Sequence, residues 1–218
     1  MSTKSTIRYS RYALPFLDAG FRAYMRRHLT GIYQEGSLQI NRERLTVLIC
    51  QHVSLFDGFA VRHMVQETGT QDRVVTIMLD SQLKRYPVLK LAGAVGITPG
   101  SIPAARSLKS MIQNEFKPAD IVVLFPQGRI ETVDGMTDRF ATGYQHFDHS
   151  NIKTDFIPVA LSIEALVHPK PTMFMKCGKP VDVHQAGQAL VDISSSLRSW
   201  LIQHGESSDT DWPGERLL

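Results

Sequence analysis

Short apolar runs alternate with helix-type segments along most of the chain, and this alternation limits the possible folds more than any other feature. The clearest strand-like runs are LTVLIC (45–50), RVVTIML (73–79), DIVVLFPQG (120–128), FIPVALSI (156–163) and PTMFMKCGKPV (171–181). Between and after them, residues 55–68, 103–116 and 186–203 place apolar side chains at helical spacing. Strands that alternate with helices predict an α/β fold with a mostly parallel central sheet flanked by helices.

Length and composition fit one globular domain with short additions. The chain has 218 residues, of which 43% are hydrophobic. We expect an N-terminal amphipathic helical segment at 1–40, a main domain at 41–204 and an acidic tail at 205–218. The net charge of +3 does not indicate binding to nucleic acid. Cys50 and Cys177 lie in apolar runs outside any CxxC pattern, so we predict buried reduced thiols, no metal site and a cytoplasmic location.

The N-terminal segment combines basic and aromatic residues. Residues 1–30 carry five arginines and Lys4 against one acid, Asp18, together with Tyr9, Tyr12 and Phe16. Such a stretch is typical of a helix that lies on an anionic membrane surface. It is also compatible with a helix that packs on the core and leaves its basic face in water. We favour peripheral binding at the inner face of the cell membrane, because anionic headgroups attract the clustered arginines. The sequence shows no signal peptide and no apolar run long enough to span.

A histidine and an aspartate follow the first strand-like run. His52 precedes Asp57 by five residues, and in one regular helix that spacing rotates the side chains apart by about 140°. One interpretation is structural, because Ser54-x-x-Asp57 matches a capping box before an apolar run. The other places His52 on the turn before the helix, where Asp57 could bind one ring nitrogen and leave the other free as a base. The two are compatible. His63, further along this helix, is expected at the surface.

Six blocks carry a resemblance when they are taken in order. QHVSLFD (51–57) resembles an NHxSxxD motif, and VVLFPQGRI (122–130) resembles one that contains FPEGTR. The remaining blocks are LKRYPVLKLAGAVGI (83–97), RFATGYQ (139–145), DFIPVAL (155–161) and MKCGKPVDV (175–183). The set resembles the glycerolipid acyltransferases, the lysophosphatidic acid acyltransferase-like family.

The resemblance implies a function and a set of site residues. Family members have an α/β fold and move a fatty acyl group from coenzyme A or acyl carrier protein to a lipid hydroxyl. By resemblance, His52 is the general base and Asp57 its orienting partner. No acyl-enzyme is required, and no cofactor beyond the acyl donor is implied. The substrate-binding residues implied by the motifs are Phe125, Pro126, Gln127, Gly128, Arg129 and Pro158.

The residues that differ from the family pattern occupy motif positions associated with binding of the acceptor. Gln127 replaces the glutamate of FPEGTR, and Arg129 and Ile130 replace its threonine and arginine. Pro99 and Gly100 stand where a second arginine is usual. Such arginines are thought to bind the acceptor phosphate, for which their planar fork is suited. Arg129 and, less directly, Arg106 are candidates to replace them. We expect a glycerolipid-like acceptor, with a phosphate-free lipid or sugar alcohol as the alternative.

Two other functional classes remain open. A hydrolase could use the same base with water in place of the acceptor, although no GxSxG nucleophile motif is present. A lipid-binding protein without turnover could retain the fold after its FPEGTR block had changed.

Overall fold

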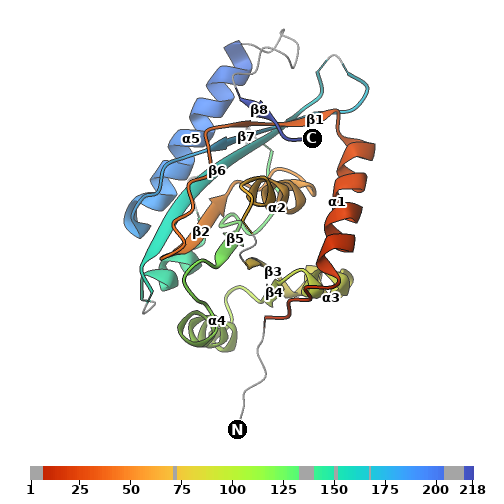
Figure 1. Cartoon of the computed structure of the whole chain (residues 1–218). Coiled ribbons are helices and arrows are strands. Elements are labelled where there is room, and N and C mark those ends of the chain that lie inside the picture. The colour runs from red at the N-terminus through yellow and green to blue at the C-terminus, as the bar shows by residue number, and fades with distance from the viewer. Residues whose placement is uncertain (1–6, 71–72, 133–139, 150–151, 167, 204–213) are drawn as a thin grey trace.

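The computed structural model describes residues 7–70, 73–132, 140–149, 152–166, 168–203 and 214–218 (Figure 1). Its centre is an eight-stranded sheet in the order β4-β3-β5-β2-β6-β7-β1-β8. The strands are β1 Gly31–Glu35, β2 Leu45–Cys50, β3 Val74–Leu79, β4 Ala94–Ile97, β5 Ile121–Leu124, β6 Thr154–Glu164, β7 Thr172–Cys177 and β8 Glu215–Arg216. The α-helices are α1 Leu14–His28, α2 Asp57–Glu67, α3 Asp80–Arg85, α4 Ile102–Asn114 and α5 Val183–Gln203. Short 3₁₀ helices cover Pro87–Leu91 (η1) and Thr142–His149 (η3).

Five neighbouring strands, from β4 to β6, run parallel. The β6–β7 and β1–β8 pairs are antiparallel, and β1 pairs with β7 in parallel. The predicted α/β fold with a mostly parallel sheet is therefore confirmed. Parallel strands place their carboxyl ends on one edge of the sheet, where reactive side chains gather in such folds.

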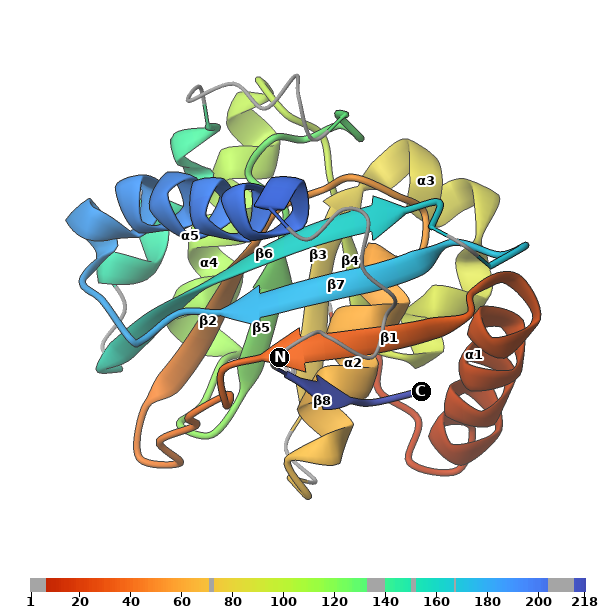
Figure 2. The same cartoon turned by 90° about the horizontal axis from the view of Figure 1, so that it is seen from above.

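Two apolar cores lie on opposite faces of the sheet. On β2, Leu45, Val47 and Ile49 point into the core shared with α4, α5 and η3. Leu48 and Cys50 point into the other core, which α2 and the end of α1 cover. Figure 1 shows α5 on one side of the sheet and α1 and α2 on the other, and Figure 2 shows α5 running across β6 and β7. Both faces of β2 are buried, which explains its continuous apolar sequence.

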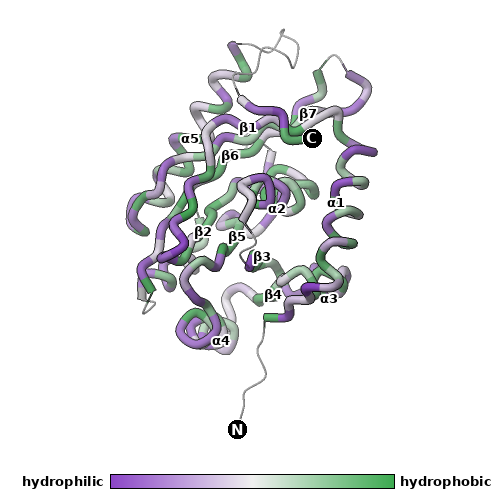
Figure 3. The backbone as a smooth tube through the Cα atoms, in the orientation of Figure 1, coloured by the Kyte–Doolittle hydropathy of each residue, from purple (hydrophilic) through white to green (hydrophobic). Residues whose placement is uncertain are grey.

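Helix α1 packs on α2, and its exposed side carries both apolar and basic residues. Phe21 of α1 stacks on Phe59 of α2 with ring centroids 4.6 Å apart. Along the tube of Figure 3, α1 alternates hydrophilic and hydrophobic residues. Among the described residues, no helix is both long enough and apolar enough to cross a bilayer.

The two ends of the sequence differ from the expectation. Residues 31–35, expected within a helical segment, form β1, which pairs with β7. Glu215 and Arg216, expected in an acidic tail, form β8 on the outer edge of β1. This C-terminal segment also covers His63, whose Nε2 lies 3.0 Å from the carbonyl oxygen of Leu217. The expectation that His63 is at the surface is therefore wrong, since the histidine is 4% exposed.

Candidate active site

His52 and Asp57 meet at the carboxyl end of β2. The strand ends at Cys50 and α2 begins at Asp57, so His52 lies on the connecting turn rather than in the helix. The turn folds back, and Nδ1 of His52 lies 2.8 Å from Oδ2 of Asp57. The spacing that separates two side chains within one helix therefore brings them together here.

The carboxylate of Asp57 is fully buried and accepts several hydrogen bonds. Oδ2 accepts the backbone N–H groups of Val53 (2.6 Å) and Ser54 (2.8 Å), and Oδ1 accepts the Ser54 hydroxyl (2.5 Å). These donors stabilise the ionised carboxylate and fix its direction. Among the described residues, no Lys or Arg forms an ion pair with this carboxylate.

The predicted capping box is only half formed. The N–H of Ser54 binds Asp57 as the box requires, but the Ser54 hydroxyl accepts the N–H of Phe56. Asp57 is the first residue of α2 rather than the third, and the N-cap Phe56 contributes no side-chain bond. Ser54 therefore orients the carboxylate more than it caps the helix.

The imidazole of His52 has one occupied and one available nitrogen. Its side chain is 24% exposed. Nε2 has no hydrogen-bond partner among the residues that the structure describes. The ring of Phe125 lies against it, with centroids 4.5 Å apart and planes inclined by 31°. A neutral imidazole that donates from Nδ1 to a carboxylate presents a basic Nε2 to a hydroxyl group.

The segment after β5 reaches His52 because of the sheet register. Ile49 pairs with Leu124, and the same offset three residues later places His52 opposite Gln127. Oε1 of Gln127 accepts the backbone N–H of His52 at 2.5 Å. Gly128, with φ +69°, ends the turn by donating its N–H to the carbonyl of Phe125.

Glu131 is a site residue that the sequence did not reveal. Its backbone N–H donates to the carbonyl of His52 at 2.9 Å. Its carboxylate accepts Nε2 of Gln127 at 3.0 Å and Nε of Arg129 at 2.7 Å. A glutamate one residue beyond the FPEGTR-like block was the available signal, but its role depends on how the turn at Gly128 folds back.

Other residues singled out in the sequence show no hydrogen bond to His52 in the part of the chain that the structure describes. Pro158 is buried in β6, opposite Ile49 and in contact with Gly178, so its role in substrate binding stays a prediction. Pro126 is buried and its carbonyl accepts the N–H of Ala141. Arg106 is exposed on α4, away from the buried stripe of that helix.

The residues before His52 serve the sheet. Oε1 of Gln51 accepts the N–H of Leu161 at 3.2 Å and so ties β2 to β6. Cys50 is fully buried, and burial raises the pKa of its thiol well above the usual range. The protonated thiol is not a nucleophile, in agreement with its interpretation as a strand residue.

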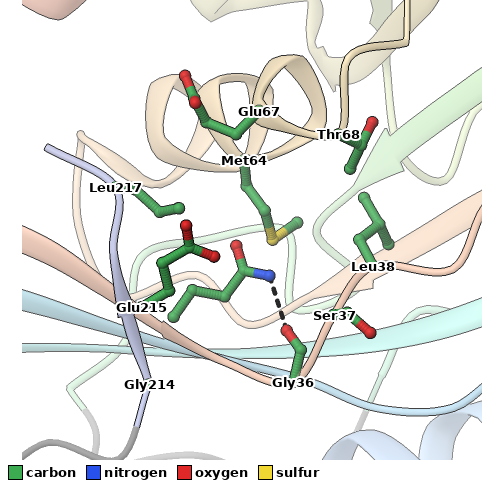
Figure 4. A pocket seen from close by; sticks show the side chains of 10 residues that line it. Gly36, Ser37, Leu38, Met64, Glu67, Thr68, Gly214, Glu215 and Leu217 are labelled. Carbon is green, nitrogen blue, oxygen red and sulfur yellow. Dashed lines mark hydrogen bonds between the residues drawn. The ribbon is translucent and has the colours of Figure 1, made fainter.

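A cavity of about 640 Å³ lies at the other end of α2 (Figure 4). Its lining includes Met64, Glu67 and Thr68 from α2, Leu38 after β1, and Leu217 from the C-terminal segment. Its α2 lining follows Asp57 by 7 to 11 residues and so lies about 10–16 Å from Asp57 along the helix axis. The cavity is therefore distinct from the site around His52.

The comparisons with known proteins agree with this geometry. A family model described as acyltransferase matches residues 31–170, which is more than half of the chain. The chain belongs to the acyltransferase family. The resemblance found in the sequence is confirmed at this level, and the match spans His52, Asp57 and the turn at Gln127.

The fold of the acyltransferase family is also found by structure. A 1-acyl-sn-glycerophosphate (LPA) acyltransferase, PlsC, from Thermotoga maritima is similar with a TM-score of 0.57 and 15% identity. The similarity covers 91% of this chain and 81% of the PlsC chain. A search of the curated proteins gave no significant match. The chain is an acyltransferase by family, and its fold is similar to that of PlsC.

Proposed function

We propose that the chain transfers a fatty acyl group from an acyl thioester to the hydroxyl of a glycerolipid-like acceptor, with His52 as general base. The observation that carries this proposal is the imidazole held through Nδ1 by a buried carboxylate, with Nε2 available beside Phe125. Nε2 takes the proton of the acceptor hydroxyl as its oxygen attacks the thioester carbonyl. The thiol leaves with that proton, and the ester forms without an acyl-enzyme.

Asp57 acts on the base rather than on the substrates. Its hydrogen bond fixes the tautomer of His52 and stabilises the imidazolium that forms during transfer. The N–H groups of Val53 and Ser54 hold the carboxylate in place, so the dyad is organised before substrate binds. General-base catalysis of this kind contributes about 10²–10⁴ in rate.

The test is acceptor-dependent thiol release. The purified chain is given palmitoyl-coenzyme A or palmitoyl-acyl carrier protein with a panel of glycerolipid and other lipid alcohols. We expect release that needs an acceptor and falls by at least about 10²-fold in His52→Ala. His184, exposed on α5, is the matched control, and His184→Ala should keep the wild-type rate.

The outcomes separate the functional classes. Release without any acceptor, lost in His52→Ala, would favour a hydrolase. No release from either donor by the folded protein would contradict the enzymatic proposal and favour a lipid-binding role.

We also propose that the chain acts while bound to the inner surface of the cell membrane. The N-terminal segment contacts η1, because the N–H of Ser10 donates to the carbonyl of Leu91. Around this contact Tyr12 and Phe16 are 88% and 82% exposed, and Val88 is also exposed. We call these three residues the docking surface. The exposed arginines nearby in the sequence are Arg8, Arg11 and Arg85.

Apolar side chains flanked by arginines suit an anionic lipid surface. Sedimentation with phosphatidylglycerol vesicles tests this role. Tyr12→Asp/Phe16→Asp should weaken binding by about tenfold or more, since burying one aromatic side chain contributes about 1.5–3 kcal/mol. Ile202→Asp, at an equally exposed apolar position on α5, should have no such effect. Equal binding by both variants would contradict the docking surface.

A further inference from the structure

The backbone of His52 is held as well as its ring. Asp57 binds Nδ1 of the imidazole, Oε1 of Gln127 accepts the backbone N–H at 2.5 Å, and the N–H of Glu131 donates to the backbone carbonyl at 2.9 Å. The bond to Asp57 alone would allow the ring to shift together with its backbone. Because both backbone groups are also bound, the direction of Nε2 is set before an acceptor arrives.

The turn that carries Gln127 is itself anchored. The residue before it, Pro126, is buried, and its carbonyl accepts the N–H of Ala141 at 2.8 Å. One residue earlier, Phe125 lies against the imidazole of His52. The turn therefore contacts His52 twice, at the ring through Phe125 and at the backbone through Gln127.

An amide is the group that suits position 127. A backbone N–H can only donate, so the amide oxygen faces His52, and Nε2 of the amide donates to Oε2 of Glu131 at 3.0 Å. An ionised glutamate, as in the FPEGTR pattern, could accept from His52 but could not donate to Glu131. Both ends of the Gln127 amide are therefore used for bonds within the chain.

We infer that Gln127 is a positioning residue, which acts on the base rather than on the acceptor. This inference rests on the proposed general-base role of His52. The family resemblance assigns position 127 to substrate binding, whereas the amide here is directed at the backbone of His52 and at Glu131. A displaced base slows proton transfer without changing how the acceptor binds, and a misplacement of about 1 Å can cost about 10²-fold in rate.

The variant Gln127→Met tests this role, because methionine keeps the length of the side chain and lacks the amide. We expect kcat for acyl transfer to fall by about tenfold or more, with KM for the acceptor unchanged. Gln188→Met is the matched control, since Gln188 also donates its amide to a carboxylate four residues later, Asp192, but at an exposed position on α5. This control should keep the wild-type kcat.

Amide hydrogen exchange gives a second measurement that needs no substrate. In Gln127→Met the N–H of His52 loses its acceptor, and its exchange, followed by NMR, should become faster by at least about fivefold. The N–H of Gln51 is the internal control, because it donates to the carbonyl of Val159 at 3.0 Å. Its exchange should not change, which also shows that the variant is folded.

The results distinguish this inference from the proposed function. A raised KM for the acceptor with kcat unchanged would assign Gln127 to the acceptor and overturn the inference while acyl transfer stands. A wild-type kcat in Gln127→Met, or equal exchange of the His52 amide in both proteins, would overturn it in the same way. No transfer by the wild-type protein, from either donor, would overturn both.

Discussion

Arg62 of α2 and Asp18 of α1 form an ion pair that is largely closed to solvent, with Nε of Arg62 2.6 Å from Oδ1 of Asp18. The same guanidinium donates to the carbonyl of Ala92 at 3.3 Å. One side chain therefore joins α1, α2 and the segment before β4. The position of the N-terminal helix relative to the dyad depends on this junction, because α2 begins with Asp57.

Removal of Asp18 should destabilise the fold. In Asp18→Ala the charge of Arg62 remains buried without its partner, and we expect a loss of about 3 kcal/mol in the free energy of unfolding. Urea unfolding followed by circular dichroism measures it. Asp192→Ala, at an exposed position on α5, should change stability by less than about 0.5 kcal/mol. If the two variants unfold at the same urea concentration, the junction does not contribute as described.

Ser54 should affect the rate more than binding. Its hydroxyl donates to Oδ1 of Asp57, so Ser54→Ala leaves that oxygen with one donor fewer. A hydrogen bond to a charged group contributes about 1.5–3 kcal/mol, and we expect kcat to fall by roughly tenfold or more with KM for the acceptor little changed. Steady-state kinetics on the acceptor found active will check this. Ser196→Ala on the far side of the sheet serves as the control, and a change confined to KM would argue against the positioning role.

Exchange of the polar groups at 127 and 131 should restore what the single change removes. Gln127→Glu places a carboxylate opposite Glu131, which should displace the turn from His52 and lower kcat by roughly tenfold or more. In Gln127→Glu/Glu131→Gln every hydrogen bond can form again, with the polarity of the Gln127–Glu131 bond reversed. We therefore expect the double variant to recover most of the lost kcat. A double variant whose kcat falls by the product of the two single effects would show that the two side chains are not coupled through this bond.

The thiol of Cys177 should resist alkylation. Burial raises its pKa to about 12, so at pH 8.5 it is ionised about 10³-fold less than an ordinary thiol. Timed iodoacetamide pulses followed by mass spectrometry should label neither cysteine in the folded protein and both in urea. Because the folded pKa lies above the unfolded one, the thiol favours folding below about pH 8.5, and this contribution declines as the pH rises above that value. Cys177 is half-buried rather than fully buried as predicted, so rapid labelling at pH 8.5 without urea would contradict the raised pKa.

The strands of the sheet centre were predictable because their sequences are apolar on both faces. The five apolar runs coincide with β2, β3, β5, β6 and β7. By contrast, β1 has the sequence GIYQE and follows a basic helix, so no local pattern marks it. It is a strand because β7, about 140 residues later, offers a parallel partner. The buried state of His63 likewise depends on the return of the C-terminal segment.

In the site, the contact between His52 and Asp57, which are close in sequence, was predictable. The contacts of His52 with the 127–131 turn were not. His52 and Asp57 were paired by spacing once His52 was placed before the helix. The bond from His52 to Gln127 depends on the register of β2 and β5, which no local spacing specifies. Glu131 lies one residue beyond the motif, and its contacts form only where the chain folds back after Gly128.

Because of the register of β2 against β5, the arrangement of the site also depends on the integrity of the folded sheet. His52 is held by Gln127 and Glu131 of the turn that follows β5, three residues beyond the last β2–β5 pair, Ile49 and Leu124. Segments built in this way open only when the whole cooperative unit opens. Loss of catalytic competence and loss of tertiary structure should therefore coincide along a denaturant titration, with no inactive but folded state between them.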